Sequence, residues 1–134
     1  MPSLTISAQL ESLTRLVDFL GKFSAHENLS REVTDRLQLV VEELFVNVVH
    51  HSQKANWVQL EVSRSETEVQ IVMMEDGEPF DWTNSRNTTM ETSLCEISIG
   101  GRGLNLVRHY STQLDYGHSE QGNRIQLRIP INEG

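Results

Sequence analysis

The sequence predicts an α/β (α+β) domain: a two-layer sandwich in which helices cover one face of a mixed, mostly antiparallel sheet. Three observations predict it. Two long segments repeat apolar residues at helical spacing, five short segments have strand-like patterns, and consecutive strand-like segments lie close enough for hairpins. With 134 residues, of which 37% are apolar and 22% charged, the chain has the length and composition of one folded domain spanning 1–134.

The first half of the chain contains one short strand and both long helices. Residues 4–6 alternate with polar neighbours, and Ser7 is placed to cap a helix that extends to about residue 25. Asn28 marks a turn, and Ser30 is the N-cap of a second helix that extends to about His51. Its inner face is formed by Val33, Leu37, Val40, Val41, Leu44 and Val48.

The second half is predicted to contain a hairpin, a long loop, a short helix and two strands. Residues 57–62 and 69–73 form the hairpin, because each run is strand-like and the residues between them are polar. Residues 76–99 have no sustained periodicity and form a long loop, which in compact domains is usually functional or disordered. A short helix follows at 104–110, and the last strands are 113–116 and 124–129.

Charge and composition exclude several classes of protein. The net charge of −8 argues against a nucleic-acid ligand, because phosphate contacts need a clustered positive surface. No run approaches the roughly 18 apolar residues of a membrane span, and the first residues lack a secretory signal, so we expect a cytoplasmic protein. The single cysteine, Cys95, excludes disulfide scaffolds and zinc modules.

The second helix carries polar residues inside an apolar run. Nine of the 13 residues from Leu37 to Val49 are large and apolar, yet Glu42, Glu43 and Asn47 interrupt them. Glu43 and Asn47 are four residues apart and share one face, so a metal-bound phosphate could satisfy both. Alternatively, both glutamates reach solvent and Asn47 caps a neighbouring backbone group.

Two histidines end the same helix. His50 and His51 stand where a cation complements the helix dipole, which is a structural role for at least one of them. The other has a second interpretation, contact with a ligand, and spacing alone does not decide between the two.

Two glycine-containing turns are candidate ligand sites. Asp76 and Gly77 directly follow a strand, where a carboxylate can accept a hydrogen bond from an amino group and glycine lets a flat ring approach the backbone. The run Gly100-Gly101-Arg102-Gly103-Leu104 precedes a helix, where free N–H groups favour an anion such as phosphate. By themselves, the first is also a common turn and the second a plain hinge.

The order of these three signals resembles the Bergerat-type ATP-binding fold of histidine kinases, gyrase, Hsp90 chaperones and MutL proteins. Glu43 to Asn47 would form the N box, Asp76-Gly77 the first glycine box, and Gly101 to Leu104 the second. The runs EELFVNVVHHS, DGEPFD and GGRGLNLVRHY are most similar to the anti-sigma-factor serine/threonine kinases of bacterial stress and sporulation control. The resemblance covers nearly the whole chain.

The resemblance implies ATP and Mg²⁺ as cofactors and assigns roles to individual residues. Glu43 matches the proposed general base, Asn47 the magnesium-coordinating asparagine, and Asp76 the aspartate that receives the adenine amino group. Residues 82–99 match the lid over the nucleotide. Gly122-Asn123 stands where many relatives have Gly-Thr, so an amide replaces the hydroxyl near the adenine. The remaining expected nucleotide-binding residues are His50, Gly77, Gly101, Arg102, Gly103 and Leu104.

The resemblance also implies a function and partners. The leading hypothesis is a protein kinase that phosphorylates an anti-anti-sigma (antagonist) protein and, in another partner state, binds a sigma factor. The alternative is a non-catalytic nucleotide-binding module that regulates a signalling partner, and a third class is a structural domain without a ligand. The strand-like start and the amphipathic first helix would suit the homodimer surface that such kinases use.

Overall fold

The computed structural model describes residues 2–51, 54–78 and 107–131, and the account below concerns these residues. A short 3₁₀ turn (Leu10–Ser12) precedes the first helix, and residues 107–110 form a helical turn within the predicted 104–110 helix. The main elements are β1 (Ser3–Ser7), α1 (Leu13–His26), α2 (Arg31–His51), β2 (Trp57–Arg64), β3 (Glu68–Glu75), β4 (Thr112–Ser119) and β5 (Gly122–Pro130).

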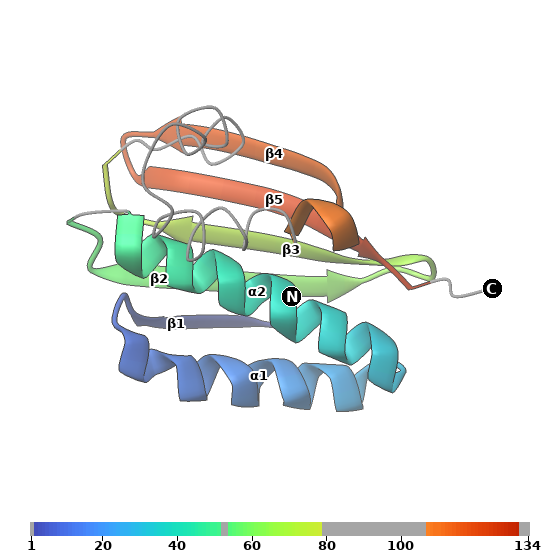
Figure 1. Cartoon of the computed structure of the whole chain (residues 1–134). Helices are drawn as coiled ribbons and strands as arrows, with labels where there is room; N and C mark the ends of the chain where they lie inside the picture. Colours follow the sequence, from blue (N-terminus) through green and yellow to red (C-terminus); the bar gives the residue numbers. More distant parts are fainter. Residues whose placement is uncertain (1, 52–53, 79–106, 132–134) are drawn as a thin grey trace.

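The five strands form one sheet in the order β1-β2-β3-β5-β4, and each described pairing is antiparallel. Both long helices lie on the same face of this sheet (Figure 1). The predicted two-layer sandwich is therefore confirmed, with a sheet that is antiparallel throughout the described pairs. The predicted strands at 113–116 and 124–129 are also present, each extended at both ends.

The core fills the space between the helices and the sheet. In β2, Val58, Leu60 and Val62 are buried, whereas Trp57 and Gln59 are half-exposed, as the period-two pattern predicts. Each fully buried Val, Leu, Ile or Phe side chain contributes about 1.5–3 kcal/mol through removal of apolar surface from water. The largest fully buried side chains belong to Leu16, Leu20, Leu37, Leu44, Phe45, Leu60, Ile71, Leu127 and Ile129.

The predicted start of the first helix is wrong. Ser7 is the last residue of β1 instead of a helix cap, and its hydroxyl contacts that of Ser12, 2.7 Å away. The chain then turns through the 3₁₀ segment before α1 begins at Leu13. Because Ser7 directly follows the buried Ile6 in an edge strand, strand pairing with Trp57 outweighs its preference for a helix N-cap.

The predicted start of the second helix is confirmed. Ser30 caps α2: its Oγ accepts a hydrogen bond from the N–H of Val33 at 3.1 Å, and its carbonyl accepts one from Thr34 at 2.9 Å. α2 has 21 residues and crosses the helical face of the sheet (Figure 1). Within the described ranges, no helix combines the length and apolar content needed to cross a membrane.

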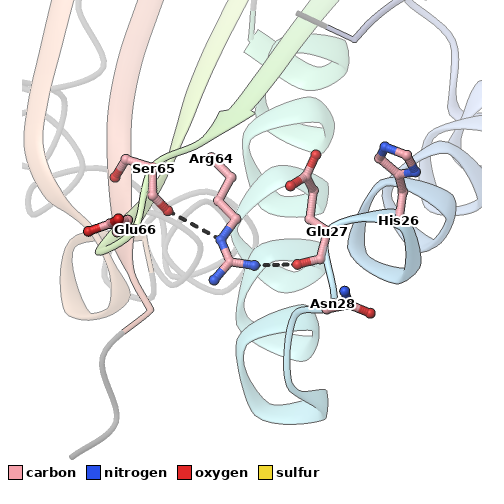
Figure 2. Close-up of a pocket in the computed structure, with 6 residues that line it drawn as sticks. All are labelled: His26, Glu27, Asn28, Arg64, Ser65 and Glu66. Carbon is pink, nitrogen blue, oxygen red and sulfur yellow. Dashed lines mark hydrogen bonds between the residues drawn. The ribbon is translucent and has the colours of Figure 1, made fainter.

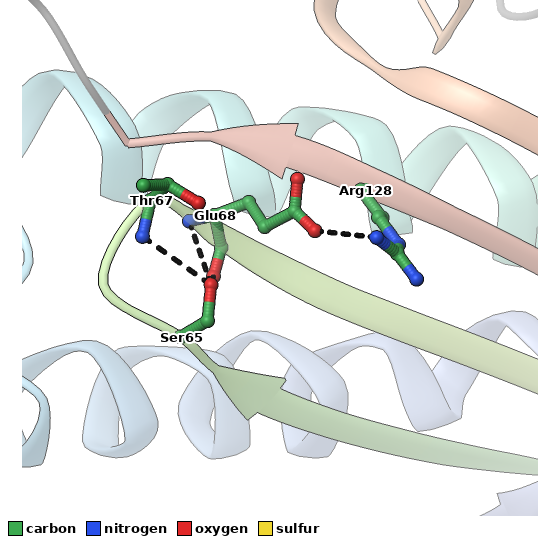
Figure 3. A network of polar contacts seen from close by, with 4 residues as sticks. All are labelled: Ser65, Thr67, Glu68 and Arg128. Atoms are coloured by element: carbon green, nitrogen blue, oxygen red, sulfur yellow. Dashed lines mark hydrogen bonds and ion pairs between the residues drawn. The ribbon is translucent and has the colours of Figure 1, made fainter.

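The β2–β3 hairpin closes at the end of the sheet that is remote from the C-terminus of α2. Ser65 shapes its turn, because its Oγ accepts hydrogen bonds from the N–H groups of Thr67 (3.3 Å) and Glu68 (3.2 Å) (Figure 3). Beside the turn, Glu68 forms a 2.7 Å ion pair with Arg128 of β5. Such a half-exposed pair contributes at most about 1 kcal/mol.

Candidate functional site

The candidate site lies at one end of the sandwich, where the C-terminal end of α2 meets the end of β3 and the start of β5 (Figure 1). Glu75 of β3 is the partner of Asn123 in β5 and of Val58 in β2. A small cavity of about 10 Å³ at this junction is lined by Val48, Met73, Glu75, Asn123 and Ile125. Val48, which follows Asn47 in α2, and Glu75, which precedes Asp76, thus line the same cavity.

Asn47 is the most unusual polar residue of the site. Its side chain is only 1% exposed, yet neither Oδ1 nor Nδ2 has a hydrogen-bond partner in the part of the chain that the structure describes. A buried amide without partners costs about 1–3 kcal/mol, so such groups require an explanation. Among the described residues, no backbone group pairs with this amide, so the capping role of the alternative interpretation is not observed there.

Glu43 lies one helical turn before Asn47 and is half-buried. The surrounding helix residues Val41, Leu44 and Phe45 are buried, so α2 is fixed by the core on its other side. Burial, together with the charge of Glu43, raises the pKa of the adjacent Glu42 above its ordinary value of 4.5. The two glutamates therefore influence one another, although Glu42 lies about 100° further around the helix.

The Asp76 carboxylate is held by the start of β2. Oδ1 accepts hydrogen bonds from the N–H groups of Asn56 (2.7 Å) and Trp57 (3.0 Å), and Oδ2 accepts one from the Asn56 side chain (3.2 Å). Partial burial alone raises the pKa of Asp76, but these hydrogen bonds outweigh it and hold the pKa below the ordinary 3.8. Asp76 is therefore an ionised acceptor at neutral pH.

The loop before β2 contacts the site from outside. Lys54, which has a positive φ of 73°, forms a 2.9 Å ion pair with Glu78, the residue after Gly77. The hydrogen bond from Lys54 to Glu78 raises the pKa of this lysine, with their charge attraction as the second cause. Both side chains are largely exposed, so the pair contributes little to folding.

Sequence reasoning missed a buried polar network directly beside Asp76. Glu75 is 2% exposed, and its carboxylate accepts hydrogen bonds from the N–H of Gly77 at 2.6 Å and from the Asn123 amide at 2.8 Å. The period-two pattern of β3 contained the signal. Val69, Ile71 and Met73 point into the core. Glu75 is the next alternate residue of the strand and therefore lies on the same buried face.

Of the other predicted site residues, some are described by the structure and others are not. His50 is exposed in the last turn of α2, three residues after Asn47, and makes contacts there. Its expected contact with the nucleotide stays a prediction. Gly101, Arg102, Gly103 and Leu104, together with the expected lid at 82–99, lie outside the described residues.

A larger depression lies at the opposite end of the sheet. It has a volume of about 480 Å³ and lies between the α1–α2 turn and the β2–β3 hairpin (Figure 2). Arg64 crosses it and donates hydrogen bonds to the carbonyl of Ser65 (3.2 Å) and to that of Glu27. These contacts tie the two turns together. The depression is remote from Asn47 and Asp76, so its size is no measure of the candidate site.

A comparison with known protein families connects this geometry to one of them. The sequence profile of the histidine kinase-like ATPase domain matches residues 6–129. One relative is the serine/threonine-protein kinase BtrW of Bordetella bronchiseptica, which is 23% identical over 128 residues, covering 93% of this chain and 90% of BtrW.

Solved structures with a similar fold belong to histidine kinases. The histidine kinase domain of the blue-light activated kinase of Erythrobacter litoralis EL346 has a TM-score of 0.56 at 19% identity. The match covers 87% of this chain but spans only 61% of that domain. The nucleotide-free catalytic domain of histidine kinase ThkA has a TM-score of 0.52 at 15% identity, with 98% of each chain covered. At such identities the likeness concerns the fold.

Proposed function

Because the chain belongs to the histidine kinase-like ATPase domain family, we propose that it is a cytoplasmic, ATP-binding regulatory kinase. Its proposed reaction transfers the γ-phosphoryl group of ATP to a serine or threonine hydroxyl of an anti-anti-sigma protein, and its second proposed partner is a sigma factor. The similarity to the serine/threonine-protein kinase BtrW along 93% of the chain supports a serine or threonine hydroxyl as the acceptor group.

One observation carries the proposal. Asn47 is a buried amide with both polar atoms unpartnered among the described residues, and it lies one turn from a half-buried carboxylate, Glu43. Within the described residues, the cost of burying that amide has no compensation. A nucleotide phosphate with its cation supplies a partner for the Asn47 amide, beside the Glu43 carboxylate.

The residues at the site fit a magnesium ion shared with phosphate. Mg²⁺ prefers oxygen ligands and usually takes one or two of them from the protein, with the remainder from phosphate and water. Asn47 Oδ1 is an oxygen of this kind, and among the described residues it has no hydrogen-bond partner. Among the described residues, no three His, Cys, Asp or Glu side chains gather as a metal cluster. The ion would neutralise charge on the phosphates during transfer.

The protein's own residues then have distinct roles in the proposed reaction. Asp76, ionised and fixed by Asn56 and Trp57, accepts a hydrogen bond from the adenine amino group. Glu43 accepts the proton of the attacking hydroxyl as it bonds to the γ-phosphorus, and the β–γ bridging bond breaks to release ADP. Asn47 would hold the cation, which would supply charge neutralisation at the phosphates. Most of the rate enhancement comes from positioning and charge neutralisation.

Transfer of radiolabelled γ-phosphate to an antagonist protein tests the kinase reaction directly. The variant Glu43→Gln keeps the size of the side chain but removes the base, so we expect transfer to fall at least about a hundredfold while Mg-ATP binding persists. Glu42→Gln is the matched control, because it changes the same chemistry one position along α2 and should retain transfer.

Three outcomes separate the hypotheses. Loss of transfer in Glu43→Gln alone supports the kinase. Mg-ATP binding by the wild type without transfer to any antagonist protein would instead support a nucleotide-dependent binding module. An equal loss in Glu42→Gln and Glu43→Gln would contradict the assignment of Glu43 as the base.

A further inference from the structure

Glu75 places a buried carboxylate directly beneath the Asp76-Gly77 turn. Glu75 is the last residue of β3. Its Oε1 accepts a hydrogen bond from the N–H of Gly77 at 2.6 Å, so the turn folds back onto the Glu75 side chain. Oε2 accepts the amide of Asn123 at 2.8 Å. A buried charge is tolerated only when such donors surround it, so the turn and Asn123 depend on each other through Glu75.

The Asn123 amide has one possible orientation. Its Nδ2 donates to Glu75 Oε2 and to the carbonyl oxygen of Glu78 at 2.7 Å, two groups that can only accept. Its Oδ1 accepts the hydroxyl proton of Tyr116 and lies 3.1 Å from Nδ1 of His118. Since Oδ1 can only accept, a hydrogen bond at this contact requires Nδ1 of His118 as its donor.

This pattern uses the whole hydrogen-bonding capacity of the amide. An asparagine side chain offers two N–H donors and two acceptor lone pairs, and Asn123 has two partners for each while only 3% exposed. No polar group of Asn123 remains for a base. The amide that stands where many relatives have a hydroxyl near the adenine thus makes its hydrogen bonds within the protein.

The contacts of Asn123 bracket the turn on both sides. Glu75 precedes Asp76-Gly77, Glu78 follows it, and the same Nδ2 binds both. Gly122 brings the backbone of β5 against β3 just here, because a Cβ at this position would lie 2.1 Å from the Glu75 carbonyl oxygen. The start of β5 thus fixes four consecutive residues that include Asp76.

We propose that Asn123 is a positioning residue for nucleotide binding: through Glu75 and Glu78 it holds the Asp76-Gly77 turn in the shape that receives the base. The inference rests on the proposed function for its ligand. Asn123 itself touches no ligand. Its amide also couples the turn to Tyr116 and His118 on the edge strand β4.

A polarity exchange between the two partners tests this role. In Asn123→Asp, two carboxylates face each other, and in Glu75→Gln, two amide donors meet, so each single variant disturbs the turn. The double variant restores one hydrogen bond with its direction reversed and keeps the net charge of the wild type. Gly77, Tyr116 and His118 retain acceptors in the double variant, and only the Glu78 carbonyl loses its donor.

Mg-ATP affinity and hydrogen exchange of the Gly77 N–H, measured by NMR on folded samples of all four proteins, give two readouts. We expect each single variant to lose about tenfold or more in affinity and to exchange the Gly77 proton faster, and the double variant to regain most of both. Wild-type affinity in both single variants would overturn the inference. Losses in the single variants without recovery in the double variant would overturn it too.

The two readouts also separate this inference from the proposed function. If the folded wild type binds no Mg-ATP, the proposed function fails and the role in nucleotide binding fails with it. Should the wild type bind Mg-ATP while Gly77 exchange is the same in all four proteins, only the positioning role of Asn123 is overturned.

Discussion

The Asp76 carboxylate accepts a hydrogen bond from the main-chain N–H of Trp57, 3.0 Å away, and so joins the end of β3 to the start of β2. Asn56 adds two further donors to the same carboxylate. The acceptor proposed for the adenine amino group is therefore fixed by the protein before any ligand arrives. Such preorganisation favours binding because less side-chain freedom is lost on association.

The lowered pKa of Asp76 makes the stability of the fold sensitive to acid. A carboxyl group with a folded-state pKa below 3.8 stabilises the native state above that value, and the contribution is lost as the pH falls through the lowered pKa. We expect the difference in unfolding free energy between the wild type and Asp76→Asn to be constant near neutral pH and to shrink in this acid range. Denaturant unfolding followed by circular dichroism against pH measures it. A difference that grows on acidification would contradict the lowered pKa of Asp76.

Replacing Asn47 by leucine should stabilise the ligand-free protein. The buried amide lacks partners among the described residues, so an apolar side chain of similar size removes its desolvation cost. We expect the unfolding free energy to rise by about 1–3 kcal/mol. Asn123→Leu is the control, because it removes an amide with four partners and should cost about 2 kcal/mol or more. Equal destabilisation by both variants would mean that Asn47 is satisfied within the protein.

Glu42 is expected to destabilise the native state when it is ionised. Its folded-state pKa is raised above 4.5, so the unfavourable charged form costs stability above that pH, and the cost vanishes as the pH falls below it. Glu42→Gln should raise the unfolding free energy at neutral pH by less than about 1 kcal/mol, because the site is half-exposed. The gain should disappear at about pH 4.

Glu66, exposed in the β2–β3 turn, provides the control for this comparison. Its substitution by glutamine should change the unfolding free energy at neutral pH by no more than about 0.5 kcal/mol. A destabilised Glu42→Gln at neutral pH would indicate that the Glu42 carboxylate has a favourable partner in the fold.

Gly122 should tolerate no side chain. Its φ of 130° is unfavourable for other residues, and an added Cβ would lie 2.1 Å from the Glu75 carbonyl oxygen and 2.9 Å from the Asp76 Cα. Since both neighbours are backbone, we expect Gly122→Ala to cost about 2–4 kcal/mol in thermal or denaturant unfolding. Gly117→Ala on the same hairpin has no atom within 4 Å of its Cβ and should be close to neutral. Similar costs for both variants would contradict the close approach of β5 to β3.

Much of the fold could be predicted because its signals are local. The apolar spacing of α2 and the Ser30 cap lie within the helix itself, and the alternation in β2 follows from one buried face. Ser7 was misassigned, because a serine suits both a helix cap and an edge strand and only pairing with Trp57 decides. The edge strand β4 extends past its predicted end. This extension could not be predicted, because Gly117 and His118 have no apolar pattern.

The site was predictable to the extent that it depends on spacing within one element. Glu43 and Asn47 share a helical face by geometry alone. The contacts that fix Asp76 join residues about 20 positions apart, and those of Asn123 with Glu75 span 48 positions, so only the folded chain brings them together. Pairings at this separation carry no local sequence signal.

Calorimetric titration with Mg-ATP tests the central claim most directly, using the wild type, Asn47→Leu, Asp76→Asn and the control Asp115→Asn, whose side chain is exposed on β4. We expect saturable binding by the wild type and by Asp115→Asn, and loss of binding in the two site variants. Absence of binding to the folded wild type, or equal affinity in all four proteins, would contradict a nucleotide site between Asn47 and Asp76.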